Sequence, residues 1–133
     1  PFEKPWLPFQ QWAKRAEGLK SSPLGILMHP EFGLWHAYRG ALLFEDEIEP
    51  EAAANPIHVC DACVGKPCMN VCPAQAVSEE GMDIGRCHGW LSPEAGQACR
   101  TEGCLARSAC PHDRFRYSPA QAAFHMAAHL RGL

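Results

Sequence analysis

Hydrophobic residues recur at helical spacing near the start of the chain, and helix signals return near its end. Trp12, Ala16 and Leu19 share one helix face, so the sequence predicts a helix over residues 7–19. Ser118, followed by Pro119 and by Gln121 three positions after the serine, is typical of a helix start. It predicts a second helix over residues 118–130. The expected apolar stripe of this second helix consists of Ala120, Ala123, Phe124, Ala127 and Leu130.

Two apolar stretches between these helices have the form of strands. Residues 25–28 predict a short strand and residues 34–44 a longer one, with turn signals at His29-Pro30 and Phe32-Gly33 between them. A hairpin or small sheet is therefore expected. Residues 45–56 are acidic and contain alanine and proline, which favours an exposed linker.

Cysteine dominates the chain after this linker. All eight cysteines lie between positions 60 and 110, and residues 1–59 contain none. A length of 133 residues with 47% hydrophobic residues suits one globular domain, and the mixed elements indicate the α+β class. We expect a helix and strand extension over residues 1–59, a cysteine-rich core over 60–111 and a C-terminal helix within 112–133.

Charge and hydropathy argue against nucleic acid and membranes as partners. The formal net charge is −3, and bound thiolates would make it more negative, so nucleic acid is not an expected partner. No uninterrupted apolar run approaches the ~20 residues that span a bilayer, and no basic-then-apolar leader precedes Trp6. We therefore expect no membrane association and a cytoplasmic location.

The cysteine spacing carries the candidate chemistry. The first four cysteines read Cys60-x2-Cys63-x4-Cys68-x3-Cys72-Pro73. This run resembles the cluster-binding run of bacterial ferredoxins, in which the cysteine before the proline serves the other cluster. The last four read Cys87-x11-Cys99-x4-Cys104-x5-Cys110-Pro111 and again end in Cys-Pro. A 4Fe-4S cluster takes four thiolates, so eight cysteines suffice for two clusters.

This resemblance implies a pairing in which each Cys-Pro cysteine is exchanged between the two halves of the cysteine region. The ligands implied for cluster 1 are Cys60, Cys63, Cys68 and Cys110. The ligands implied for cluster 2 are Cys72, Cys87, Cys99 and Cys104.

A narrower resemblance covers about residues 33–111. Residues 83–91, which read Asp-Ile-Gly-Arg-Cys-His-Gly-Trp-Leu, are followed by Gly103-Cys104 and Cys110-Pro111. These motifs resemble the ferredoxin-like module of epoxyqueuosine reductase and of the reductive dehalogenases, which implies a ferredoxin-like dicluster core that delivers electrons. The chain departs from the family in two places: four residues separate Cys63 from Cys68 where two are usual, and Arg107 stands near the family's middle cysteine. Cys99 would then replace that ligand, and without it only one 4Fe-4S cluster is expected.

The same family carries a cobalamin-binding domain ahead of this module. The residues before Cys60 are too few for such a domain, which needs well over ~100 residues. We therefore expect an electron-transfer protein that is not itself an enzyme, either a ferredoxin or the electron-delivery subunit of a reductase, with a redox protein as partner. Donor and acceptor are not specified by the sequence.

Other functions are compatible with the cysteine pattern. Two structural zinc ions would also use eight thiolates, and the chain would then be a structural or interaction module. Four disulfides are the weakest alternative, because the chain is long enough to build a core.

Several side chains near the cysteines are candidates for secondary roles. His58, His88 and His112 lie within two residues of a cysteine and are candidate hydrogen-bond donors to cluster sulfur, and Trp90 is expected to shield cluster 2. Four arginines are interpreted either as compensating charge or as a docking edge for an acidic partner: Arg100, Arg107, Arg114 and Arg116.

Overall fold

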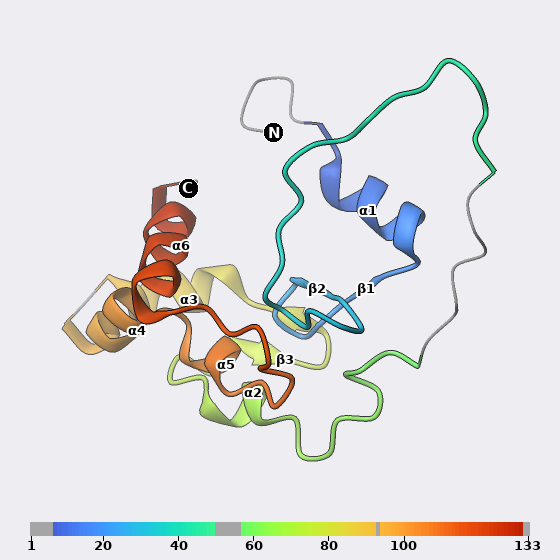
Figure 1. The fold of residues 1–133 in the computed structure, drawn as a ribbon. Helices are drawn as coiled ribbons and strands as arrows, with labels where there is room; N and C mark the ends of the chain where they lie inside the picture. The colour runs from blue at the N-terminus through green and yellow to red at the C-terminus, as the bar shows by residue number, and fades with distance from the viewer. Residues whose placement is uncertain (1–6, 50–56, 93, 132–133) are drawn as a thin grey trace.

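The computed structural model describes residues 7–49, 57–92 and 94–131, and within them short helices combine with two small sheets (Figure 1). The elements are, in chain order, α1 (Phe9–Glu17), β1 (Lys20–Ser21), β2 (Leu27–Met28), α2 (Pro67–Val71), β3 (Val77–Ser78), β4 (Gly81–Met82), α3 (Ile84–Leu91), the 3-10 helix η1 (Glu94–Gly96), α4 (Gln97–Glu102), α5 (Leu105–Ser108) and α6 (Pro119–Arg131). Both sheets are two-stranded and antiparallel. This mixture agrees with the expected α+β class.

The first helix and the first sheet form a small layer of their own. Helix α1 confirms the predicted N-terminal helix with shorter bounds, because Gly18 adopts a left-handed conformation (φ 64°) that ends it. Strand β1 then pairs with β2, with Lys20 opposite Met28. Ala13 of α1 packs against Leu19 and Leu27, so the layer is held by a hydrophobic cluster.

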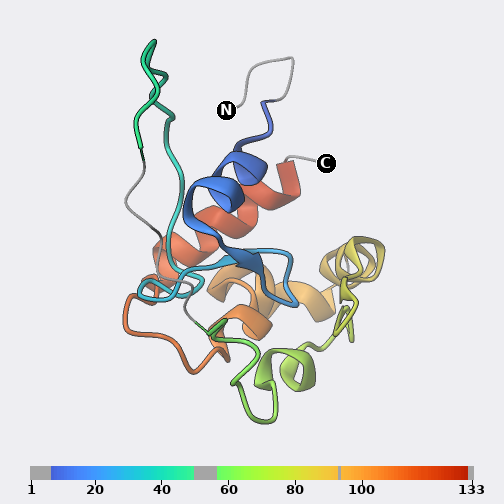
Figure 2. The ribbon, with the colours of Figure 1, turned by 90° about the vertical axis from the view of Figure 1, so that its right-hand side faces the viewer.

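The predicted long strand over residues 34–44 is wrong. The described chain from Trp35 to residue 49 contains no helix or strand, and its middle part loops away from the body in both views (Figures 1 and 2). Leu42 and Leu43 are 83% and 92% exposed. The reason is that β1 already pairs with β2, and no other described strand pairs with this stretch.

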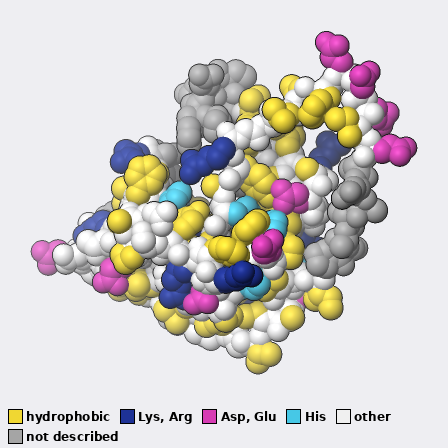
Figure 3. Space-filling view, in the orientation of Figure 1, with side chains coloured by type: hydrophobic (Ala, Val, Ile, Leu, Met, Phe, Trp, Pro, Cys, Tyr) yellow, Lys and Arg dark blue, Asp and Glu magenta, His cyan; other side chains and the backbone are white. Residues whose placement is uncertain are grey.

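Acidic side chains gather at the tip of this loop (Figure 3). They belong to the expected linker, of which residues 45–49 are irregular and exposed. Residues 50–56 of that linker lie outside the described part of the chain.

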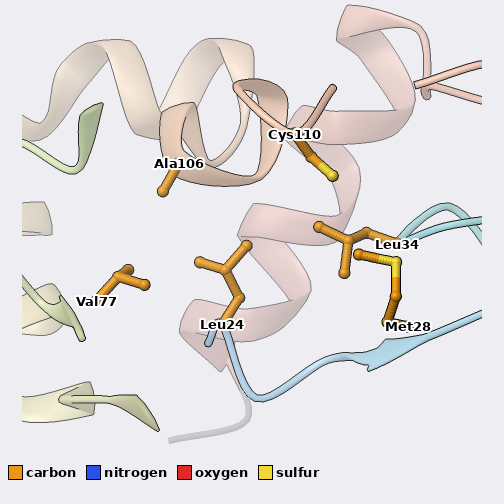
Figure 4. Packing of buried hydrophobic residues seen from close by; sticks show 6 residues of the cluster. All are labelled: Leu24, Met28, Leu34, Val77, Ala106 and Cys110. Atoms are coloured by element: carbon orange, nitrogen blue, oxygen red, sulfur yellow. The ribbon is translucent and has the colours of Figure 1, made fainter. Parts of the chain in front are cut away.

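The main hydrophobic core joins the N-terminal segment to the cysteine region (Figure 4). It consists of Leu24, Met28, Leu34, Val77, Ala106 and Cys110. Leu34 and Ala106 are the most buried of these residues, at 1% exposure each. The N-terminal segment therefore packs directly on the cysteine region, in addition to the smaller cluster within its own layer.

Polar contacts reinforce this junction. The indole Nε1 of Trp35 donates a hydrogen bond of 3.2 Å to the carbonyl of His112. The guanidinium of Arg107 donates to the carbonyl of Leu34 and lies 4.7 Å from the centre of the Trp35 ring and 4.8 Å from that of Tyr117. Such cation–π contacts stabilise a buried arginine that has few polar neighbours.

The C-terminal helix is confirmed, but its predicted packing face is wrong. Ser118 and Gln121 form the expected capping contacts, with the Ser118 hydroxyl 3.1 Å from Oε1 of Gln121. Met126 is the buried residue of α6, whereas Phe124 is 63% exposed. The helix turns this way because Gly103 lets Ala122 approach the backbone: a Cβ on Gly103 would lie 2.6 Å from the Cβ of Ala122. None of the described helices has the length and apolar character needed to cross a membrane.

The close contact of Gly33 with His112 yields a test of the junction. A Cβ on Gly33 (φ +60°) would lie 2.7 Å from the carbonyl oxygen of His112, whereas one on Gly25 (φ +73°) would meet nothing within 4 Å. We expect Gly25→Ala to lower the free energy of unfolding by about 1–2 kcal/mol, which is the backbone cost alone. Gly33→Ala should lower it by at least about 1 kcal/mol more, because of the overlap. Urea titrations of both variants measure the difference, and equal losses would refute the close packing.

Candidate metal centre

All eight cysteine thiols are free in the structure. Cys99 and Cys110 are buried, and the other six are partly buried. The structure therefore contains none of the four disulfide bonds considered as an alternative. The eight thiols instead separate into two groups of four, which are described in turn below.

The first set consists of Cys60, Cys63, Cys68 and Cys110, and these four residues line one cavity of about 560 Å³. Cys60 and Cys63 lie in the loop before α2, Cys68 lies in α2, and Cys110 follows α5. Burial raises the pKa of Cys60 to about 11, and nearby Cys110, Cys68 and Cys63 contribute in that order. The pKa of Cys110 is likewise raised by burial, with further contributions from Cys63 and Cys68. The four thiols are thus close enough that the negative charge of one thiolate raises the pKa of its neighbours.

A left-handed turn accommodates the long gap between Cys63 and Cys68. Gly65 (φ 75°) and Lys66 (φ 36°) both adopt positive φ, which reverses the chain just before α2 begins. The side-chain amide of Asn70 donates a 2.8 Å hydrogen bond to the Gly65 carbonyl, and Lys66 pairs with Glu79 at 3.0 Å. The two extra residues therefore form an ordered turn.

The second set consists of Cys72, Cys87, Cys99 and Cys104, which line another cavity of about 20 Å³. Burial raises the pKa of Cys87 to about 11, and Cys104, Cys72 and Cys99 raise it further. Burial also raises the pKa of Cys104, with smaller increases from Cys99 and Cys72. The cavity is small because Leu91 and Met126 pack against Cys99.

Each set gathers residues from both halves of the cysteine region. Helix α2 carries Cys68 of the first set and ends at Cys72 of the second, while α5 begins after Cys104 of the second set and ends just before Cys110 of the first. Because α2 packs against α5, the two helices together present one set at each end. The places of Cys72 and Cys110 follow from this packing.

Helical structure covers the gap between Cys87 and Cys99. Residues 94–96 form η1 and lead into α4, which carries Cys99 on its buried side. Gly96 allows the close approach to α3, since a Cβ there would lie 2.5 Å from the carbonyl of Trp90. Helix α4 thereby brings Cys99 to Cys104 and Cys87. Pro93 lies outside the described residues.

Backbone N–H groups point at several of these sulfur atoms. The N–H of Ala76 donates to Sγ of Cys72 at 3.4 Å. Backbone hydrogen bonds from Ala106 and Arg107 lower the pKa of Cys104, and one from His112 lowers that of Cys110, each against the larger effect of burial. Such donors favour a thiolate over a thiol.

Each of the two sets offers four sulfur donors. In residues 7–49, 57–92 and 94–131, no three His, Cys, Asp or Glu side chains converge closely enough to hold one metal ion. Four sulfurs around a shared cavity match the ligand set of a 4Fe-4S cluster. In addition, the indole Nε1 of Trp90, which lines the second cavity, is buried without a hydrogen-bond partner among the described atoms. A sulfur atom bound by the second set of cysteines could accept a hydrogen bond from this indole N–H.

The histidines near the cysteines use their rings elsewhere. His58 lies 3.3 Å from the carbonyl of Lys20, and His112 lies 3.2 Å from the carbonyl of Glu31. His88 and His129 place their Nε2 atoms 3.2 Å apart. None of these contacts reaches a cysteine, so the predicted histidine donors to sulfur remain predictions.

Arg107 was interpreted from the sequence either as compensating charge or as part of a docking edge. In the structure it lies between Trp35 and Tyr117, and burial lowers its pKa. Among the other arginines of that edge, Arg116 forms a 3.0 Å ion pair with Asp113. No local signal could have placed Arg107, because Leu34 and Trp35 are distant in sequence.

Comparison with protein-family models, with curated proteins and with solved structures gives no match for this chain.

The raised thiol pKa values generate a test on reduced, metal-free protein. At about pH 8 a thiol of pKa about 11 holds about 100-fold less thiolate than one with the ordinary value of 9.0, so Cys60 and Cys87 should be alkylated slowly by iodoacetamide. Peptide mass spectrometry measures the rates, with the same protein in urea as control. Equal rates in the folded and unfolded protein at about pH 8 would contradict the assignment.

The raised pKa values of Cys60 and Cys87 also determine how the stability of the fold changes with pH. The folded chain holds these protons more tightly than the unfolded chain. The contribution of Cys60 and Cys87 is therefore fully present below pH 9.0 and is lost as the pH rises through about 11.

Proposed function

We propose that the chain is an electron-transfer protein that carries two 4Fe-4S clusters on a ferredoxin-like dicluster core. The first set of cysteines would hold one cluster and the second set the other. The observation that supports this proposal is the separation of eight thiols into two sets of four, each around its own cavity. A ferredoxin or an electron-delivery subunit of a reductase is the class of protein that needs such an arrangement.

The protein would hold the clusters, shield them from water and adjust their reduction potentials. When bound, each cluster takes up one electron and passes it on. The thiols of both sets lie among apolar side chains, which keep water from most of each site. Backbone N–H groups aimed at Cys72, Cys104 and Cys110 would stabilise the added negative charge.

The short helix α2 fixes how far apart the two sites lie. Cys68 and Cys72 are four residues apart, which corresponds to a rise of about 6 Å along a helix. Cys104 and Cys110 span the neighbouring helix α5 in the same way. An electron would therefore travel only about the length of these short helices, with no change in the fold.

Exposed residues beside the first site would make it a contact point for a redox partner protein. Residues 61, 62, 64 and 65 are exposed, and Val64 is 95% exposed. Small, transient interfaces of this kind suit electron-transfer partners. The free thiols are consistent with the reducing cytoplasm, where we place the protein.

Metal and sulfide analysis tests this proposal directly. Protein purified without oxygen should contain about eight irons and about eight acid-labile sulfides per chain. Cys99→Ser should reduce both to about four, because the second set loses a ligand. The matched variant Cys63→Ser should also leave about four, by removing a ligand from the first set.

The outcomes separate the alternatives. A Cys99→Ser protein that keeps about eight irons would refute the place of Cys99 in the second set. About four irons in the unaltered chain would mean one cluster, and zinc without sulfide would mean a structural or interaction module.

The unpartnered indole of Trp90 gives a second test. Trp90→Phe keeps an aromatic ring beside the second set but removes the N–H group. Loss of a hydrogen bond to sulfur should lower the reduction potential of the second cluster by on the order of tens of millivolts. Redox titration followed by electron paramagnetic resonance measures the shift, and Trp12→Phe, which changes an indole far from both cavity linings, is the control. An unchanged second potential would refute this contact.

A further inference from the structure

Residues 39–49 form an exposed arm that leaves the body of the molecule (Figures 1 and 3). Its apolar part is a run of three large side chains: Leu42 and Leu43 are 83% and 92% exposed, and Phe44 is 64% exposed. A contiguous exposed apolar patch, unlike a single exposed residue, marks a contact surface. The hydrophobic clusters of the described chain do not use these side chains, so the arm is a candidate for contact with another molecule.

The backbone of the arm is also unpaired within the described part of the chain. None of the described residues from 36 to 49 takes part in a backbone–backbone hydrogen bond there. Residues 36–44 contain no turn that would fold the arm back on the layer from which it emerges. Both the side chains and the backbone of the arm are therefore available to a partner.

An apolar pocket of about 210 Å³ lies where the arm begins. Its wall comes from α1, β2 and the segment just before the arm, and includes Phe9, Leu27 and Tyr38. None of the described wall residues is a cysteine, and none carries a permanent charge. The volume corresponds to about seven water molecules, which suits one large apolar side chain better than an organic cofactor.

Cations lie beside this pocket, on the same layer of the structure. Lys14 follows the wall residue Gln10 by one turn of α1, so the two side chains share a face of the helix. Arg15 and Lys20 add further positive charge, so that α1 and β1 carry three cations and one carboxylate. The arm has the opposite charge, because residues 40–49 contain four carboxylates and neither lysine nor arginine.

The chain therefore carries both an apolar, acidic arm and a small apolar pocket with cations beside it. Leu42 follows the wall residue Tyr38 by only four residues, so the arm would need a tight reversal to reach its own pocket. A second copy of the chain related by a twofold axis removes this restriction, because each arm then meets the pocket of the other copy.

We propose that two copies of this chain form a twofold dimer by exchanging their arms. Leu42 and Phe44, which share one side of an extended segment, cover the pocket of the other copy. The carboxylates that follow them lie beside Lys14 and Arg15 of that copy. Neither cysteine set lines the pocket, so the dimer is independent of what the cysteines bind.

Sedimentation velocity of the anaerobically purified protein tests the dimer. At about 100 µM protein and about 0.05 M salt, the unaltered chain should sediment as a dimer. Raising the salt to about 0.5 M should increase the dissociation constant at least about threefold, because salt screens exposed charges. A monomer at low salt overturns the proposal.

Charge reversal locates the contact. Glu45→Lys/Glu47→Lys should sediment as a monomer, and so should Lys14→Glu/Arg15→Glu, because like charges then meet in each homodimer. An equal mixture of the two variants should recover the dimer, since each arm of the mixed pair meets the opposite charge. A mixture that stays monomeric, or a dimer of either variant alone as tight as that of the unaltered chain, overturns the proposal.

Two further variants complete the test. Phe44→Ser removes an apolar contact without changing the charge and should raise the dissociation constant at least about 10-fold. The control Glu94→Lys/Glu102→Lys makes the same change in net charge at η1 and α4 and should leave the dimer intact, whereas its dissociation would overturn the assignment to the arm. If Lys14→Glu/Arg15→Glu does not fold, an undiminished dimer in both Phe44→Ser and Glu45→Lys/Glu47→Lys still overturns the proposal.

Discussion

The packing of α2 against α5 is the constraint on which the rest of the structure depends. These are two of the shortest helices in the described chain, and neither would be stable alone. Their contact is stabilised because Ala106 of α5 is small enough to be buried at 1% exposure against Val77 and Leu24. Every cysteine that flanks these helices is then placed at one end of the pair or the other.

This arrangement brings cysteine thiols close together, where ionisation of one disfavours ionisation of the others. Burial and neighbouring thiols both raise the pKa of Cys60 and Cys87, so these two cysteines are neutral thiols in the metal-free chain. Any group that binds thiolates must displace these protons, and its affinity should therefore rise with pH. The backbone N–H groups near Cys104 and Cys110 act in the opposite direction and favour the thiolate.

Local signals in the sequence were reliable, and contacts between distant segments were not. The Ser118 capping pair correctly placed the start of α6, because it depends on neighbouring residues only. The strand expected over residues 34–44 failed because strand composition does not supply a pairing partner. The face of α6 was misjudged because it depends on Gly103, and the buried position of Arg107 depends on Trp35. The resemblance to ferredoxin modules implied the grouping of the cysteines, and the described structure places the same sets of four around two cavities.

The exposed loop after Tyr38 separates two parts of the chain that already hold each other by other means. The Trp35 indole reaches the His112 carbonyl, and Arg107 reaches the carbonyl of Leu34, so the junction does not depend on the loop itself. Leu42 and Leu43 in that loop are almost fully exposed and contribute little to the core. The peptide link there is therefore dispensable: two fragments divided within the loop should reassociate into the same fold, and a reporter domain inserted at this point should leave both cysteine sets intact.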